Sequence, residues 1–78
     1  MTTIAGKAYQ FIIASDIQRN GLGLELWDHP QTEILAEIFR NDSTKCIELY
    51  VDKKGVPLEA IEELIRRFDT HVGRIFQG

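Results

Sequence analysis

Apolar and polar residues alternate along two stretches that flank Asn20-Gly21. Both residue types tolerate positive φ, which a two-residue type I′ hairpin turn requires. In that register residues whose numbers add up to 41 face each other, so that Asp16 lies opposite Glu25. One face of this hairpin then collects the apolar residues Tyr9, Phe11, Ile13, Ile17, Leu22, Leu24 and Leu26. The alternation and the turn independently predict an antiparallel hairpin with one apolar face.

Two further segments continue this apolar face. If residues 33–40 form a strand, Ile34, Ala36 and Ile38 share one face. Residues 45–51 place Ile47, Leu49 and Val51 on one face and are rich in residues that favour strands. If residues 41–44 form the loop between them, Ile38 faces Ile47 and Glu37 faces Glu48. Residues 32–39 also fit a short amphipathic helix with Thr32 as its N-cap. We favour the strand because it extends the core face in register.

The segment after Pro57 has helical spacing, and Pro57 itself suits the first position of a helix. Its apolar residues are Leu58, Ile61, Leu64, Ile65, Phe68, Val72 and either Ile75 or Phe76. A helix of roughly 16–20 residues would be about 24–30 Å long and could cover one face of a four-stranded sheet. Whether it ends at Gly73 is left open. The pattern predicts one α+β domain over residues 1–78, a four-stranded antiparallel β-meander with one C-terminal amphipathic helix packed on one face (ββββα).

Composition narrows the class of protein. The 78 residues are 44% hydrophobic and 27% charged, as in an ordinary globular domain. A net charge of −3 disfavours nucleic acid as a partner. No apolar run approaches the ~20 residues of a membrane span, and the first residues do not resemble a signal peptide. We therefore expect a cytoplasmic protein that binds neither nucleic acid nor membrane.

The face of the predicted sheet that points away from the helix combines apolar and acidic residues. Its apolar members are Ile12, Ala14, Trp27, Leu35, Phe39, Cys46 and Tyr50, and its acids are Asp16, Glu25, Glu37 and Glu48. In the predicted register the acids form two directly opposed pairs, which is destabilising. Trp and Tyr commonly anchor interfaces, and acids beside them favour a basic partner. The plainer interpretation is a solvated sheet face with scattered apolar residues.

Catalytic chemistry has little support in the sequence. Cys46, His29 and His71 are the only candidates for a soft nucleophile or base, and nothing brings them together with an orienting acid. A single cysteine cannot form an intramolecular disulfide, and the chain lacks both zinc-site spacing and an Asp-x-Asp-x-Asp-Gly loop. Gly21-Leu22-Gly23 does not open a helix and is not a phosphate loop. We expect no catalytic residue, metal or cofactor.

These observations predict a non-enzymatic protein-interaction module, such as an inhibitor, an immunity-type protein or an accessory subunit. Its partner would be a protein with a basic, partly apolar surface. The expected contact residues are Trp27, Tyr50, Phe39, Leu35, Asp16, Glu25, Glu37 and Glu48. One alternative is a homodimer that buries the same face and has a structural or small-molecule-binding role, since a chain this short gains stability from association. A more distant alternative is an enzyme that uses Cys46 or a histidine.

Overall fold

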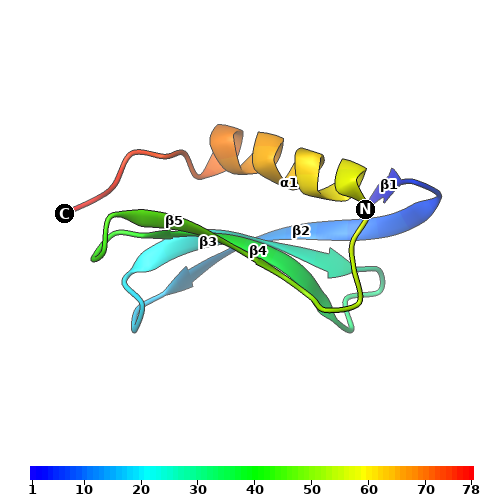
Figure 1. Ribbon diagram of the computed structural model, residues 1–78, viewed down its shortest axis with the longest axis horizontal. Coiled ribbons are helices and arrows are strands. Elements are labelled where there is room, and N and C mark those ends of the chain that lie inside the picture. The colour runs from blue at the N-terminus through cyan, green and yellow to red at the C-terminus, as the bar shows by residue number, and fades with distance from the viewer.

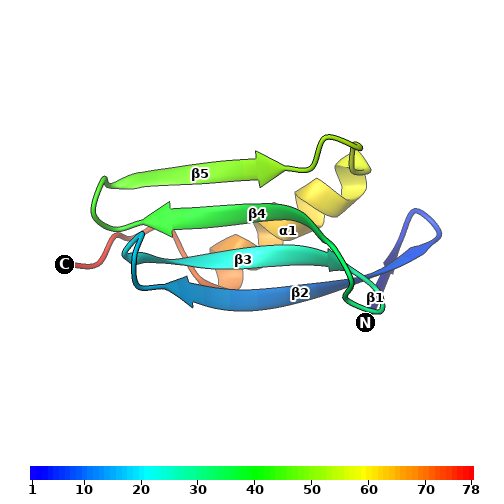
Figure 2. The ribbon, with the colours of Figure 1, turned by 90° about the horizontal axis from the view of Figure 1, so that it is seen from below.

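Five strands and one helix form two layers in the computed structural model, which describes residues 1–78 (Figure 1). The elements are β1 (Thr2–Ile4), β2 (Lys7–Asp16), β3 (Gly21–Asp28), β4 (Ile34–Asn41), β5 (Cys46–Val51) and α1 (Leu58–His71). The strands pair antiparallel in the order β1-β2-β3-β4-β5. Helix α1 crosses one face of this sheet, and no other element covers the opposite face (Figures 1 and 2). The predicted α+β class is confirmed, with five strands in place of four.

The additional strand is β1, a three-residue segment that the alternation analysis did not detect. It pairs with the start of β2, where Thr2 lies opposite Tyr9 and Ile4 opposite Lys7. The turn between them consists of Ala5 and Gly6, both with positive φ, as a tight two-residue hairpin requires. Three residues are too few for a period-two pattern to stand out.

The expected two-residue turn at Asn20-Gly21 is wrong. Residues 17–20 form the loop, and Asp16 pairs with Gly21 at its base. Asn20 has a φ of 56°, whereas Gly21 lies outside the left-handed region. Gly21 is required for a different reason, because the Phe39 ring and the Arg40 carbonyl oxygen occupy the space that a Cβ would need. Ile17, which we expected in the core, is in this loop and 94% exposed.

Residues 34–41 form a strand, which confirms the strand over the helix alternative. The β4–β5 loop consists of residues 42–45, one position later than expected, and Lys45 at its end has a φ of 58°. Consequently Ile38 faces Leu49 and does not face Ile47. The shift is two residues along β5, an even number, so the side chains of β5 keep the faces predicted for them.

The core lies between α1 and the sheet. Its buried members are Tyr9, Leu24, Leu26, Ala36 and Ile38 from the strands and Ala60, Leu64 and Phe68 from the helix. The three helical residues are four positions apart and thus share one face. The helix has 14 residues and ends before Gly73, whose φ of 85° lets its N–H turn back to the Phe68 carbonyl. No helix in the protein is long and apolar enough to cross a membrane.

A buried ion pair fastens the end of the helix to the sheet. Arg40 Nε donates to Asp42 Oδ1 at 3.0 Å, and Arg40 Nη1 donates to the carbonyl of Val72 at 3.0 Å. Asp42 Oδ1 also accepts from the Gln77 backbone N–H at 3.0 Å. The Gln77 bond, followed by the one from Arg40, lowers the pKa of the Asp42 carboxyl. Arg40 therefore donates to the carbonyl of Val72, the residue that directly follows α1, and ties the end of the helix to β4.

A second polar link joins the other side of α1 to β1 and β2. Glu63 accepts from Arg66 Nε at 2.9 Å and from Arg67 Nε at 2.7 Å. Arg67 Nη2 donates to Thr2 Oγ1 at 2.8 Å, and its guanidinium lies 4.1 Å from the centroid of the Phe11 ring. The bonds from Arg66 and then Arg67 lower the pKa of Glu63 from 4.5 to about 2.

This shift predicts a specific acid sensitivity. Because the folded pKa of Glu63 is depressed, its contribution to stability is complete above about pH 4.5 and is lost as pH falls toward about 2. Glu63→Gln should therefore lose less stability than the wild type across this interval, as measured by urea unfolding at successive pH values. Glu62→Gln is the matched control, since Glu62 is an exposed helix residue without an ion-pair partner. Parallel acid profiles for the wild type and Glu63→Gln would contradict the assignment.

Candidate functional site

The outer face is the surface formed by side chains of β2 to β5 that point away from α1. The pairing aligns these side chains in rows across the strands. One row is Gln10, Trp27 and Ile34, the next is Ile12, Glu25, Glu37 and Tyr50, and the third is Ala14, Gly23, Phe39 and Glu48. The predicted combination of aromatic and acidic residues is thus present on this face, although with different neighbours.

The two opposed acid pairs that we expected do not form. Asp16 lies opposite Gly21, and Glu48 lies opposite Phe39, because both hairpin loops differ from the expected ones. A different like-charge pair exists, since Glu25 on β3 is directly opposite Glu37 on β4. Opposed carboxylates repel each other, so each needs a compensating donor.

Arg19 provides this compensation for Glu37. It comes from the β2–β3 loop, which bends to the side of the sheet away from α1 (Figure 1). Its two terminal nitrogens donate to the two Glu37 oxygens at 3.2 and 3.1 Å, and its Nε donates to Asp16 Oδ2 at 2.6 Å. The bonds to Glu37 and Asp16 raise the pKa of Arg19, and the bonds from Arg19 lower the pKa of Asp16. Such a bidentate arrangement fixes the guanidinium in place.

Phe39 is not an exposed anchor, which corrects our prediction. Although its side chain points to the outer face, it is 0% exposed. The ring lies against Gly21 and Gly23 of β3, and the Arg19 guanidinium covers it at 3.8 Å from the ring centroid. The two glycines form a trough that a larger residue would fill. Their position on one face, two residues apart, was the only sequence signal for this arrangement.

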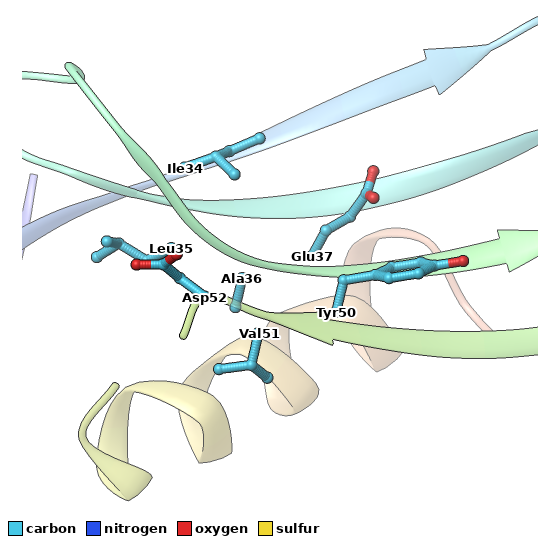
Figure 3. A pocket seen from close by; sticks show the side chains of 7 residues that line it. All are labelled: Ile34, Leu35, Ala36, Glu37, Tyr50, Val51 and Asp52. Carbon is cyan, nitrogen blue, oxygen red and sulfur yellow. The ribbon is translucent and has the colours of Figure 1, made fainter. Parts of the chain in front are cut away.

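Leu35 is also absent from the outer face. The pairing shifts between Leu26 and Trp27, so that Trp27 faces Ile34 and Leu35 packs against the core cluster. Figure 3 shows Ile34 and Glu37 on one side of the strands and Ala36 and Val51 on the side of the helix. A shallow depression at this end of β4 and β5 is lined by Ile34, Leu35, Ala36, Glu37, Tyr50, Val51 and Asp52. A bulge of this kind moves one residue to the opposite face.

Trp27 and Tyr50 are the aromatic residues left accessible on the outer face. Trp27 is half-buried, and its indole Nε1 donates to Glu25 Oε1 at 2.9 Å. Tyr50 is 46% exposed and lies on the same strand as Glu48, whose carboxylate raises the pKa of the Tyr50 hydroxyl. The indole bond orients the tryptophan and satisfies one of the two opposed carboxylates.

The candidate catalytic residues are dispersed. Cys46 is exposed at the start of β5, next to the β4–β5 loop. His29 lies in the β3–β4 loop at the opposite end of the sheet, and His71 is the last residue of α1 (Figure 2). No group of three or more His, Cys, Asp or Glu side chains gathers at one point.

No family model, no curated protein and no solved structure matches the chain. The functional argument therefore depends on the outer face itself. This face carries four carboxylates, those of Asp16, Glu25, Glu37 and Glu48, and its one basic side chain is Arg19. It is thus an uncovered, negatively charged surface with an accessible indole and an accessible phenol.

Proposed function

We propose that this protein is a non-enzymatic binding module that uses its outer face to hold a protein partner. The observation that carries the proposal is the absence of any covering element over a face that contains Trp27 and Tyr50. Both residue types are enriched at the centres of protein interfaces. The partner surface would present apolar side chains to the row of Gln10, Trp27 and Ile34, which is the least charged part of the face.

Charge supports a basic partner. Arg19 is already occupied by Asp16 and Glu37, which leaves Glu25 and Glu48 without a basic neighbour within the protein. A Lys or Arg of the partner placed between these carboxylates would also relieve the repulsion between Glu25 and Glu37. The negative electrostatic potential of the outer face favours the approach of a cationic protein, and a higher salt concentration would weaken this attraction.

The proposal can be tested by affinity capture from native cell extract, followed by titration of each captured protein. Trp27→Ala and Glu25→Lys should lower capture of the true partner by at least ~10-fold, because truncating an interface tryptophan or reversing an interface charge removes a large part of the affinity. Glu25→Lys is expected to fold, since it replaces one of two opposed carboxylates. Neither residue is on β5, so these variants leave that strand unchanged.

Controls on the opposite side of the molecule make the test specific. Leu58→Ala removes an exposed apolar residue of α1, and Glu62→Lys reverses an exposed acid of the same helix. Both should retain full capture. Trp27 is the only tryptophan, so its emission reports contact with the outer face directly. A captured protein that leaves this emission unchanged, or that is lost equally with the helix variants, would refute the proposal.

A further inference from the structure

Strand β5 is an open edge of the sheet. No element lies alongside it on the side away from β4 (Figure 2). Its side chains are exposed on both faces, since Leu49 is 51%, Tyr50 46% and Val51 47% exposed. The strand has the sequence Cys-Ile-Glu-Leu-Tyr-Val, with one charge and no proline. Proteins normally protect such an edge with charges, prolines or bulges, and β5 has almost none of these protections.

The unpaired backbone groups of β5 can be identified. The Asp52 N–H donates to the Leu35 carbonyl at 2.9 Å, which places Asp52 at a bonded position of the β4–β5 ladder. Bonded positions recur at every second residue of an antiparallel pair, so Tyr50, Glu48 and Cys46 also bond toward β4. The N–H and C=O groups of Ile47, Leu49 and Val51 therefore point outward from the sheet.

We propose that β5 pairs antiparallel with β5 of a second copy, about a two-fold axis at Leu49. In this arrangement Leu49 of each copy bonds to Leu49 of the other, and Ile47 bonds to Val51 of the other in both directions. All outward-pointing groups of the three residues are then paired. A two-fold axis perpendicular to the sheet must pass at a residue, because opposed residues share a face and are an even number of positions apart.

Charge selects Leu49 as that residue over its neighbours. An axis at Glu48 would place two glutamates directly opposite each other, and an axis at Tyr50 would place Glu48 opposite Asp52, both unfavourable. With the axis at Leu49, Glu48 of one copy lies opposite Tyr50 of the other, so that a carboxylate meets a phenolic donor. On the helix side of the sheet, Ile47, Leu49 and Val51 of both copies form one apolar row.

The surroundings of β5 extend this apolar row. A groove of about 160 Å³ beside β5 is lined by Ile38, Ile47, Glu48, Leu49, Ile65, Phe68 and Arg74. Ile65 of α1 is exposed there, because the helix crosses β3 and β4 and leaves β5 uncovered. The opposite edge of the sheet is formed by the part of β2 that does not pair with β1. Among the side chains of this part that point to the helix side, Ile13 is the one exposed apolar residue. The β5 edge thus offers more apolar surface to a second copy than the β2 edge.

Sedimentation equilibrium of the full chain tests the dimer. The wild type should behave as a dimer, and Leu49→Lys should raise its dissociation constant by at least ~100-fold by placing two ammonium groups at the axis. Ile13→Lys is the matched control, since Ile13 is 50% exposed on the same side of the sheet but at the opposite edge. Ile13→Lys should stay dimeric, and circular dichroism should show that both variants are folded. A wild type that is monomeric at all concentrations, or dissociation by Ile13→Lys alone, would overturn the proposal.

Single-cysteine variants test the register. In a Cys46→Ser background, Leu49→Cys should form a disulfide-linked dimer under mild oxidation, because Cα atoms of bonded antiparallel pairs are about 5.5 Å apart. Ile47→Cys in the same background should not, since its two copies would be about 13 Å apart. Linkage through position 47 and not 49, or through neither, would exclude the Leu49 axis. Trp27→Ala should leave the sedimentation behaviour and the disulfide linkage unchanged. A negative result for the dimer would therefore say nothing against partner binding by the outer face, and the reverse also holds.

Discussion

Replacing Phe39 by alanine is expected to destabilise the protein by about 3–5 kcal/mol, a large share of the ~5–15 kcal/mol that a small domain possesses. The ring is fully buried between the glycine trough of β3 and the Arg19 guanidinium. Its removal leaves a cavity and deprives Arg19 of the surface on which it lies. Urea unfolding followed by far-ultraviolet circular dichroism measures this loss.

Tyr50→Ala is the matched control for Phe39→Ala. Tyr50 is an aromatic residue on the same face, one strand away, but half of its side chain is in solvent. Its truncation should cost only a fraction of the stability lost with Phe39. Equal losses for the two variants would mean that the outer face has no buried packing of its own, in conflict with the position of Phe39.

Gly21→Ala is the second substitution with a large expected effect, about 3 kcal/mol or more. The new methyl group would overlap the Arg40 carbonyl oxygen as well as the Phe39 ring, at 2.6 Å from ring atom Cζ. A backbone oxygen in a strand cannot move without disturbing the β3–β4 pairing. Thermal and urea unfolding of the variant should both show the loss.

Gly23→Ala separates close approach from a general intolerance of alanine in β3. The nearest atoms to a Cβ at Gly23 are Phe39 Cδ1 at 3.0 Å, and Glu37 Oε2 and the Ile38 carbonyl oxygen at 3.1 Å. Two of these belong to side chains that can shift by a few tenths of an ångström. The variant should therefore retain more stability than Gly21→Ala, and the reverse order would contradict the described packing.

The faces of the strands could be predicted from the sequence, while the pairing of residues across them could not. Each expected loop was wrong, which displaced the partner of Asp16 by four positions and the partner of Ile38 by two. Both displacements are even, and a pleated strand returns the same face after two residues. The core residues Leu24, Leu26, Ala36 and Ile38 were therefore assigned correctly despite the wrong neighbours.

The parts of the candidate site that sequence reasoning missed depend on contacts between distant segments. Asn20-Gly21 has the composition of a tight turn, but Gly21 is needed for contact with Phe39, and the loop also has to place Arg19 over that ring. The bulge that removes Leu35 from the outer face could not be located from the sequence, since Ile34, Leu35 and Ala36 are all apolar and fit either face of the sheet. Trp27, Tyr50 and the four acids, in contrast, followed directly from period-two alternation.

The order of the strands has a consequence for how the protein folds. Every strand pairs with the next one in the chain, and no connection between paired strands exceeds five residues. The sheet can therefore form by closing short loops one after another, each with a small loss of chain entropy. Two links between the helical segment and the sheet, Arg67 to Thr2 and Arg40 to Val72, join residues 65 and 32 positions apart. Both links require α1 to lie on the sheet, so we expect docking of α1 to follow formation of the hairpins.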